Sequence, residues 1–574
     1  MPEYLAPGVY VEETSFRAPS IEGVGTSTAA FVGPTLTGPI SGTPELLTSF
    51  GDFANIYGGY DNLAIAGNTA DPKNVNYLAL SVKAFFDNGG SRLYVSRVFT
   101  KKGDADTGTA ATAAASDDHL VVQSRYPGTG GNGSVTVSLV AARTQAVGNL
   151  PPGTVLAQVP DGGGAPTIYT NGTTGAFKSG ATPLPTPLPA KLYALTMSVT
   201  AHTASGANAV YEGLGFDPAH PRYIGAVLGP VPPRRIDALE NQFAFVPGKN
   251  LNPSTLITEI FGALADPANT ASKVYVLSGG DDGGEPSAQD YDDALVRLQA
   301  LEDIAIVCAP GAAIFSSADA VAAKLIAHVS RQRAYRVAIL DTPPNFIASQ
   351  VEDVRSKMDS SYAALYTPWI VAANPLARPG TSAPAEVTVP PSGFMAGIYA
   401  RNDQEHGVAK APANEVVLGA LRFERDINFA EQGVLNPLGI NCLRFFSGRG
   451  YRVWGARTAS SDSEFKYINV RRYLIYLEHS IDRSSQWAVF ENNGPALWTR
   501  VRESVDAFLY NEFREGNLLG TTPAEAYFVR CDRSTMTQND LDNGRLICLI
   551  GVALLKPAEF VIFRIGQKTA DARV

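Results

Sequence analysis

The hydrophobic positions of the chain follow different periods along its length, and each period predicts a different kind of structure. Between residues 75 and 86 apolar side chains recur at helical spacing, stop at Asn88-Gly89-Gly90, and are followed by the apolar run LYVSRV. This pattern predicts a helix and then a strand. From about Ser254 amphipathic helices again alternate with short apolar strands. Such an alternation is typical of a parallel sheet that is covered by helices on both faces.

The elements expected in this second stretch are, in order, helix STLITEIFGALA, strand KVYVL, helix SAQDYDDALVRLQAL, strand IAIVCAP, helix SADAVAAKLIAHVSRQ and strand RVAILD. Ser287, with Asp290 three residues later, has the spacing of a helix N-cap. The stretch therefore predicts a central α/β domain with a mostly parallel sheet.

Residues 103–230 follow a different pattern, in which short alternating runs are separated by clusters of turn residues such as PGTGGNG and DGGGAP. They contain only 12 charged residues but 19 Gly and 12 Pro. This composition predicts an inserted all-β domain. Within it, ATPLPTPLPAK predicts a stiff, polyproline-like connector.

The last 134 residues change pattern again, with two long helical patterns near 467–483 and 495–515 and then the strand patterns AYFVRCD, RLICLIGVALL and EFVIFRI. We therefore expect an α/β and α+β multidomain protein with extended terminal arms. The expected division is 1–28 N-terminal arm and linker, 29–102 and 231–440 central α/β domain, 103–230 inserted outer β domain, and 441–574 C-terminal α+β domain with an arm strand.

Composition and charge narrow the possible functions. With 574 residues, of which 45% are hydrophobic and 18% charged, the chain is too long for one core and too apolar to be disordered. Its net charge of -9 disfavours a nucleic acid as partner. The last 134 residues carry a net charge of +3, so we expect them to meet an acidic surface. The opening MPEYLAPGVYVEE predicts no signal peptide, and no run is apolar enough for membrane insertion.

No pattern of the sequence predicts a cofactor or metal. The four cysteines are far apart in apolar runs, as expected for buried thiols, and the six histidines form no close pair. Gly128, Gly130 and Gly133 have the spacing of a dinucleotide fingerprint, but a strand pattern follows where a helix is required. The acidic run GGDDGGEP lacks the ligand spacing of a calcium loop, and no P-loop occurs. We expect GGDDGGEP to be a solvated turn.

One enzymatic alternative remains open. Gly25-Thr26-Ser27-Thr28-Ala29 resembles the serine motif of subtilisin-like proteases, and Asp341 and His406 could complete a Ser-His-Asp set. Against it, Ser27 lies in a short stretch that lacks the expected helix N-terminus and oxyanion donors.

The two ends of the chain carry strand patterns with no obvious partner. Such a strand must find hydrogen-bonding partners, because an open edge promotes aggregation. The partners could lie in the same chain or in neighbouring copies, where strand addition would hold a polymer together. The residues of the two arm strands are Gly8, Val9, Tyr10, Val11, Glu12 and Glu13 at the N-terminus, and Glu559, Phe560, Val561, Ile562, Phe563, Arg564 and Ile565 at the C-terminus.

Several segments together resemble contractile tail sheath proteins. They are YLAPGVYVEETSFRAPSIEGVGTSTAAFVGP, ALSVKAFFDNGGSRLYVSRV, YPGTGGNG, and the run from NPLGINCLRFFSGRGYRVWGART to PAEFVIFRIGQ. The resemblance covers roughly residues 1–130 and 235–574. The stretch from LWTRVRESVDAF to the end of that run is more similar to sheaths of phage-tail-like extracellular contractile injection systems than to those of ordinary phages.

The resemblance implies a non-enzymatic structural subunit without cofactors. Copies would form hexameric rings, stacked helically around an inner tube protein in a metastable extended state that contracts to drive the tube through a target envelope. Baseplate and cap proteins would be further partners, and the particle would be assembled in the bacterial cytoplasm, from which it could be released. A static shell or surface-layer subunit is an alternative that shares the same strand addition.

In this family the two terminal arms add strands to neighbouring subunits, which assigns that role to the arm strands above. The basic C-terminal domain would face the tube. The candidate tube-facing residues lie on or beside the two predicted helices, whose charged faces could alternatively be merely solvated. They are Lys466, Arg471, Arg472, Arg500 and Arg502.

Overall fold

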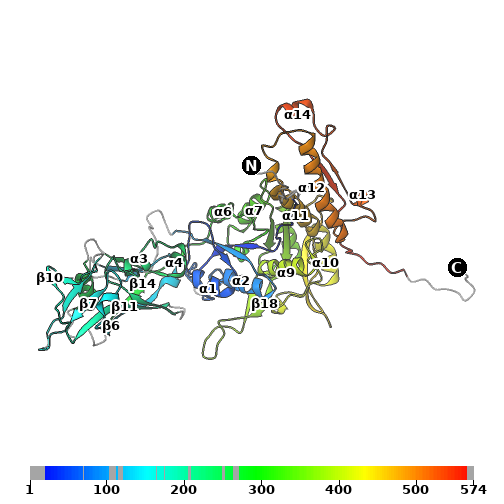
Figure 1. Cartoon of the computed structure of the whole chain (residues 1–574). Coiled ribbons are helices and arrows are strands. Elements are labelled where there is room, and N and C mark those ends of the chain that lie inside the picture. Colours follow the sequence, from blue (N-terminus) through cyan, green and yellow to red (C-terminus); the bar gives the residue numbers. More distant parts are fainter. Residues whose placement is uncertain are drawn as a thin grey trace, which may run out of the picture.

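The computed structural model describes residues 20–68, 70–101, 112–113, 120–162, 164–172, 175–203, 208–247, 252–262 and 271–564. Three parts are visible in Figure 1: a central α/β body, a long β lobe on the left, and a C-terminal part that projects at the upper right. The first two expected domain types and the mostly parallel central sheet are thus present, which confirms the predicted fold class.

The central body is built on an eight-stranded sheet in which all pairings between its six inner strands are parallel. The two edge strands, β2 and β22, pair antiparallel with their neighbours. The spatial order of the strands is β2 (Leu46–Leu47), β3 (Leu93–Val98), β1 (Ala29–Pro34), β15 (Ile306–Cys308), β16 (Val337–Asp341), β17 (Ala363–Thr367), β21 (Ile440–Phe446) and β22 (Gly450–Val453).

Helices cover both faces of this sheet because successive strand residues point to opposite sides. Phe31 of β1 faces the first layer, where it makes an edge-to-face contact with Phe85 at 5.6 Å, while its neighbours Ala30 and Val32 face the second layer. The first layer holds α1 (Phe50–Tyr57), α2 (Tyr77–Asp87) and α9 (Pro391–His406). The second holds α6 (Ala288–Val296), α7 (Ala318–Val329), α8 (Ala348–Ser356) and α10 (Phe429–Leu435).

Local signals in the sequence set several of these boundaries correctly. The prediction for Ser287 is confirmed, because its hydroxyl accepts the backbone N–H of Asp290 and the Asp290 side chain bonds back to the backbone of Ser287.

A small antiparallel sheet flanks the body and consists of β18 (Ile370–Ala373), β19 (Glu386–Val389) and β20 (Ala420–Phe423).

The β lobe is built on an eleven-stranded sheet whose pairings are antiparallel, as predicted for the insert. Its strands are β4 (Thr112–Ala113), β5 (Leu120–Ser124), β6 (Gly133–Arg143), β7 (Val155–Gln158), β8 (Thr167–Thr170), β9 (Lys178–Ser179), β10 (Thr182–Pro183), β11 (Leu192–Thr203), β12 (Asn208–Leu214), β13 (Phe243–Pro247) and β14 (Ser272–Ser278). Three short helices accompany it, α3 (Ile224–Val227), α4 (Arg235–Glu240) and α5 (Pro253–Phe261).

One predicted strand lies in a different sheet from the one the sequence suggested. The run KVYVL was assigned to the parallel sheet, but it forms β14 and pairs antiparallel with β6. That assignment is wrong because the local alternation of helix and strand does not determine which sheet a strand joins. At the other end, β21 pairs with β17 in the central sheet, so a domain boundary at Asn441 would divide a strand of the body.

The C-terminal part contains the two long helices that were predicted, α11 (Ile468–Ser484) and α12 (Pro495–Arg514). They pack against each other through a small core that includes Tyr473 and Leu477 of α11 and Phe508 and Leu509 of α12. Beyond them lie α13 (Pro523–Ala526), β23 (Tyr527–Arg530), α14 (Gln538–Asp542) and β24 (Leu549–Val552). Among the described helices, none is both long enough and apolar enough to span a bilayer.

Candidate assembly surface

The strands β23 and β24 form a two-stranded antiparallel sheet in which Phe528 is opposite Gly551. One face packs on the core between α11 and α12 through Tyr527, while Val552 lies at its margin. On the other face Phe528 is 52% and Leu549 48% exposed. No third strand joins this sheet from the described residues. Because this sheet has only two strands, it presents backbone edges to which further strands could be added.

The C-terminal arm leaves the body as an extended chain (Figure 1). Residues 560–564 have no strand partner within the described part of the chain. The side chains of Phe560, Val561, Ile562 and Phe563 are 70%, 69%, 77% and 83% exposed. Burying an apolar side chain of this size contributes about 1.5–3 kcal/mol each. Four such neighbours left in water therefore mark a segment that needs a covering partner.

Glu559 fixes the root of this arm to the body. Its carboxylate receives hydrogen bonds from the Arg457 guanidinium at 2.6 and 2.8 Å, from the Tyr467 hydroxyl at 2.9 Å and from the Asn436 amide at 2.7 Å. Burial raises the pKa of Glu559, but these hydrogen bonds outweigh burial and the net shift is downward. Glu559 is thus bound within its own chain, and the free arm begins at Phe560.

The N-terminal linker is hydrogen-bonded to α11. The backbone N–H of Glu22 donates to Ser484 Oγ at 3.3 Å, and that of Val24 donates to Ser480 Oγ at 3.2 Å. The backbone at Gly23 passes so close to α11 that a Cβ there would lie 2.3 Å from the Tyr476 hydroxyl. The linker is therefore docked at residues 22–26, whereas the predicted N-terminal arm strand, Gly8 to Glu13, lies outside the described residues, as does Ile565.

A buried ion pair completes the docking of the linker. Arg472 of α11 contacts Asp403 of α9 at 2.5 Å, and their side chains are only 3% and 5% exposed. The Thr26 hydroxyl donates to the same carboxylate at 2.6 Å, and Arg472 donates to the Thr26 carbonyl at 3.1 Å. Burial lowers the pKa of Arg472, but Asp403 more than compensates and the net shift is upward. The pair ties the linker, the body and the C-terminal part together.

The structure corrects part of the predicted tube-facing set. Arg471 and Arg472 are buried, because α11 is enclosed between the body and α12. Arg471 stacks over Phe465 and Tyr362 with its guanidinium 3.7 and 4.3 Å from the ring centres. These two arginines cannot face a tube in this conformation.

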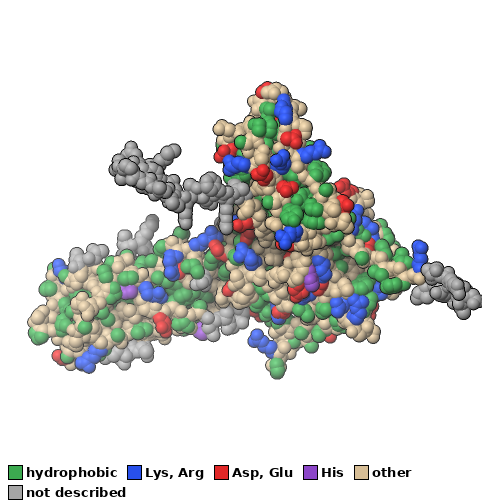
Figure 2. All heavy atoms as spheres, turned by 45° about the vertical axis from the view of Figure 1, so that its right-hand side comes forward, with side chains coloured by type: hydrophobic (Ala, Val, Ile, Leu, Met, Phe, Trp, Pro, Cys, Tyr) green, Lys and Arg blue, Asp and Glu red, His purple; other side chains and the backbone are tan. Residues whose placement is uncertain are grey.

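The other three candidates remain available. Arg500 and Arg502 of α12 are exposed and Lys466 is half-buried. Figure 2 shows basic and acidic side chains interspersed on the projecting C-terminal part, whereas charged side chains are sparse on the β lobe. Charged residues are usually exposed, so the sequence alone favoured all five.

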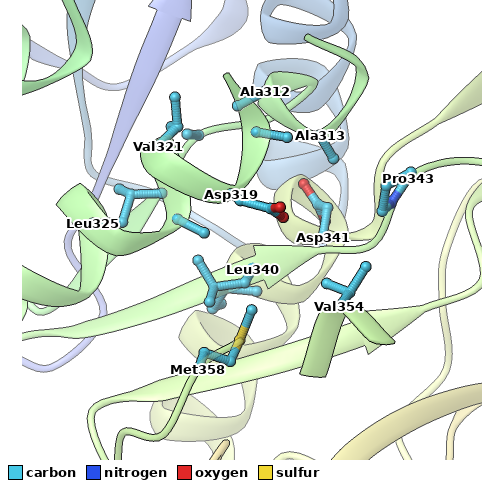
Figure 3. A pocket seen from close by; sticks show the side chains of 14 residues that line it. Ala312, Ala313, Asp319, Val321, Leu325, Leu340, Asp341, Pro343, Val354 and Met358 are labelled. Atoms are coloured by element: carbon cyan, nitrogen blue, oxygen red, sulfur yellow. The ribbon is translucent and has the colours of Figure 1, made fainter. Parts of the chain in front are cut away.

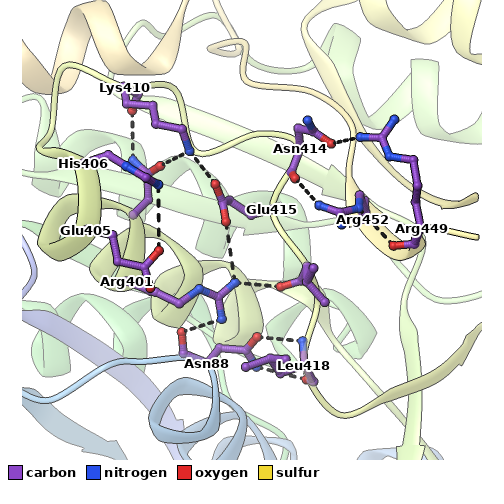
Figure 4. A network of polar contacts seen from close by, with 12 residues as sticks. Asn88, Arg401, Glu405, His406, Lys410, Asn414, Glu415, Leu418, Arg449 and Arg452 are labelled. Carbon is purple, nitrogen blue, oxygen red and sulfur yellow. Dashed lines mark hydrogen bonds and ion pairs between the residues drawn. The ribbon is translucent and has the colours of Figure 1, made fainter.

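The structure separates the residues of the hydrolase alternative. Asp341 accepts hydrogen bonds from the backbone N–H and hydroxyl of Ser392, at 2.7 and 2.6 Å, at the start of α9. His406 is the last residue of the same helix, about 21 Å away at 1.5 Å per residue. In Figure 4 it lies beside Glu405 at 3.8 Å. The proposed Ser-His-Asp set is therefore wrong.

The polar network of Figure 4 is a structural one. Arg401 donates to the carbonyl of Val416 at 2.7 Å, and Lys410 pairs with Glu415. The Asn88 side chain binds both the N–H and the carbonyl of Leu418, at 2.9 and 3.1 Å. These contacts fix residues 410–418 between α2 and α9, and the charges involved are satisfied within the chain.

A small pocket of about 40 Å³ lies at the carboxyl ends of β15 and β16, where open α/β sheets commonly bind ligands (Figure 3). Its two carboxylates are already engaged, Asp341 by Ser392 and Asp319 by Lys357 at 2.6 Å. Burial raises the pKa of Asp341 to about 7. A cavity of this size holds no more than a water molecule or two, so it offers no substrate site.

The acidic turn and the thiols also have structural roles. Asp282, in GGDDGGEP, is only 3% exposed and binds Thr129 of the β lobe and the Ala64 backbone of the body. The prediction of a solvated turn is therefore wrong for this residue, which joins the two parts. Within the described segments no three His, Cys, Asp or Glu side chains form a metal-binding group. Of the four free thiols, Cys548 alone is not fully buried.

Comparison with known proteins identifies the family. Residues 284–459 match the model of the phage tail sheath protein central domain, and residues 460–568 match that of the phage tail sheath C-terminal domain. The boundary between them follows β22, in agreement with the place of β21 in the central sheet. The chain belongs to the phage tail sheath family, whose members are structural proteins and not enzymes.

The curated relatives have low sequence identity to this chain, and each is matched over only part of its length. The tail sheath protein of Vibrio phage KVP40 is 27% identical over 188 residues, which cover 32% of this chain and 27% of that protein. A putative prophage major tail sheath protein of Pseudomonas aeruginosa is 26% identical over 31% of this chain and 45% of its own length. The chain thus spans less than half of the length of these curated relatives.

Solved structures share the fold over nearly the whole chain. The sheath of the extracellular contractile injection system PVC, in its contracted state, superposes with a TM-score of 0.53 at 20% identity and covers 99% of both chains. The contracted helical sheath of the anti-feeding prophage gives 0.53 at 21% identity, over 98% of this chain and 99% of that one.

Proposed function

We propose that the chain is the sheath subunit of a contractile injection particle or phage-like tail. Copies polymerise around an inner tube in an extended, metastable state and contract to drive the tube through a target envelope. The observation that carries this proposal is the combination of an open two-stranded sheet, β23–β24, with an apolar arm that has no partner in its own chain.

The arms would contribute favourable free energy at every contact between subunits. In the proposed assembly, Gly8–Glu13 of one neighbour and Phe560–Ile565 of another add strands to β23–β24. Each backbone hydrogen bond contributes about 0.5–1.5 kcal/mol net, so a strand of six residues contributes a few kcal/mol per contact. Burial of the apolar arm side chains adds to this, and the contacts are repeated around every ring.

The same arrangement permits contraction without a ligand. The subunit would move as a rigid body while its arms stay paired, with the bends located between the docked roots and the arms. At the C-terminus the bend would follow the Glu559 anchor, and at the N-terminus it would precede Ile21, which packs against the core between α11 and α12. Two packings of one rigid subunit are a known basis for switching.

The proposal also places the partners and layers. The C-terminal part would form the inner layer, with Lys466, Arg500 and Arg502 as candidate contacts to the tube protein, and the β lobe would lie outermost. Baseplate and cap proteins would close the ends of a particle that is assembled in the bacterial cytoplasm. Screened surface ion pairs would suit a tube contact that must later be released.

Deletion of residues 1–15 tests the proposal. We expect a folded monomer that forms no tubes in negative-stain microscopy, and the same result for a chain that ends after Glu559. The matched control ends after Gln567, beyond the arm strand, and should still assemble. Long tubes formed by the chain without residues 1–15 and by the chain that ends after Glu559 would contradict the proposal.

The number of tube geometries distinguishes a contractile sheath from the alternative, a static shell. A contractile sheath should yield two forms of tube that differ in length and diameter, whereas a shell should yield one geometry under all conditions.

A further inference from the structure

A polar cleft lies where the end of α11 meets the turn between α7 and β16. Its volume is about 420 Å³. Four arginines contribute to its lining, Arg331, Arg333 and Arg336 from the turn and Arg483 from α11. The acidic lining residues are Glu302 and Asp482. The cleft therefore carries an excess of positive charge.

Asp482 does not neutralise the excess positive charge of the cleft, because it already pairs with Arg333. It forms a two-pronged ion pair with Arg333, with the shortest contact at 2.7 Å, and accepts the Tyr335 hydroxyl at 2.9 Å. Gln486 donates a further hydrogen bond to it at 3.0 Å. Once Arg333 and Asp482 cancel, three arginines face a single carboxylate, that of Glu302.

Arg336 is the innermost of the three and is only 2% exposed. One of its terminal nitrogens contacts His328 Nε2 at 2.9 Å and the other donates to the Leu301 carbonyl. Its Nε is enclosed and has no hydrogen-bond acceptor among the described residues. Burial, together with the nearby Arg331, lowers the pKa of Arg336 to about 10. A buried charge of this kind is normally matched by an anion.

Arg331 and Arg483 form the exposed rim. Within the described ranges neither has a carboxylate partner, and Arg331 donates only to the His328 carbonyl at 3.1 Å. Tyr335 and His479 stack at 4.7 Å and form one wall. Burial lowers the pKa of His479 and Arg483 lowers it further, so the imidazole favours its neutral form there.

We propose that this cleft binds a multivalent oxyanion of the phosphate class, such as pyrophosphate or a phosphate ester, through Arg331 and Arg483, with the buried positive charge of Arg336 behind them. The planar guanidinium group matches the paired oxygens of a phosphate, and several such groups converging in a concave site provide the selectivity. The cleft is large enough for more than one phosphate group. The anion would join the turn at 331–336 to the end of α11, beside the docked N-terminal linker, and so stabilise their contact. This inference does not depend on the proposed function.

Isothermal titration of the full-length monomer with pyrophosphate, and separately with inorganic phosphate, at constant ionic strength tests the proposal. We expect saturable binding that is tighter for pyrophosphate. The double variant Arg331→Gln/Arg483→Gln should weaken it by about tenfold or more, because it removes two charge-assisted contacts. Glu302→Gln should strengthen binding, since it removes the unpaired carboxylate. This gain would not arise from a purely structural role.

The matched control is Lys178→Gln/Lys191→Gln, which removes two exposed positive charges from the β lobe and should leave binding unchanged. Absence of saturable binding would overturn the proposal, as would an equal loss in the control, which would indicate unspecific charge attraction. Binding of a glutamate-rich peptide without binding of pyrophosphate would also overturn it, in favour of a protein partner.

Discussion

At the scale of single residues, the Arg472–Asp403 pair is the most consequential contact found. It is enclosed by α9, α11 and the N-terminal linker, so removing one partner leaves an uncompensated buried charge. We expect Arg472→Ala to lower the free energy of unfolding by about 3–5 kcal/mol. Exposed Arg502→Ala should change it by less than about 0.5 kcal/mol. Urea unfolding followed by tryptophan fluorescence measures both, and similar small effects of the two variants would contradict the assigned role.

Glu559 gives a second prediction, in which pH is the variable. Its pKa is lowered in the folded chain, so its ion pair with Arg457 contributes fully above the unfolded-state pKa, near 4.3, and is lost as the pH falls through the folded-state value. The hydrogen-exchange protection of the Glu559 amide, which donates to the Pro557 carbonyl at 3.0 Å, should therefore be high at neutral pH and fall below about pH 4, after correction for the pH dependence of intrinsic exchange. Glu559→Gln should show the low protection already at neutral pH.

The control for this anchor is the neighbouring exposed Lys556→Ala, which removes a charge without touching the Arg457 contact. Equal exchange in wild type and Glu559→Gln would show that the arm root is held by something else.

At the same scale, the burial of Arg471 and Arg472 could not be predicted from the sequence. Helical spacing shows that neighbouring positions point in different directions, but it does not show that α11 is covered on both sides by the body and α12. No sequence pattern pointed to the ion-pair partner of Arg472, because Asp403 is 69 residues away along the chain and becomes a neighbour only in the fold.

At the scale of elements, the C-terminal arm has the sequence pattern of a strand but pairs with none of the described strands. Its backbone makes no strand pairing in the described chain, so a proline there should leave the monomer unchanged but remove a hydrogen-bond donor from the assembled sheet. We expect Ile562→Pro to keep the unfolding temperature of the monomer and to abolish tube formation, as seen by negative-stain microscopy.

Ile562→Val, which retains both the apolar side chain and the backbone N–H, is the control and should assemble. If the proline variant formed tubes as readily as wild type, main-chain pairing of this segment would be excluded as a source of the assembly energy.

The elements themselves were largely predictable, and their partners were not. Helical and strand periods located α2, α7, α11 and α12, and the capping signal located the start of α6. Strand β14 was recognised but assigned to the wrong sheet. Its burial alternates, with Val274 and Val276 exposed and Tyr275 and Leu277 buried, which is the pattern of a sheet with one solvated face. The run VYVL is apolar at every position, so this alternation becomes visible only in the folded chain.

At the scale of the whole molecule, the parts differ in how firmly they are joined. Asp282 holds the β lobe to the body through Thr129 and Ala64, and Arg472 holds the C-terminal part through Asp403. Residues 560–564 of the C-terminal arm, in contrast, pair with no described strand, and the arm is fixed at its root by Glu559. We therefore expect the three parts to move together during contraction, while the pairing of the arms keeps neighbouring subunits connected.

A cross-link between the C-terminal part and the body tests this expectation. Cysteines introduced for Arg333 and Asp482, whose native side chains are paired at 2.7 Å, should be linked by a short bismaleimide, which bridges the two parts without preventing contraction. The double serine variant at the same positions is the control for the lost ion pair. Tubes that assemble but remain in the extended form when cross-linked would show that the two parts must separate.

The most direct test of the account is a side-chain-resolution cryo-electron microscopy map of the assembled tube in which residues 555–565 can be traced. The account predicts that the chain leaves its own subunit after Glu559 and that residues 560–565 lie as an added strand on the β23–β24 sheet of a neighbour. A trace that turns back after Glu559 and pairs within its own subunit would contradict it.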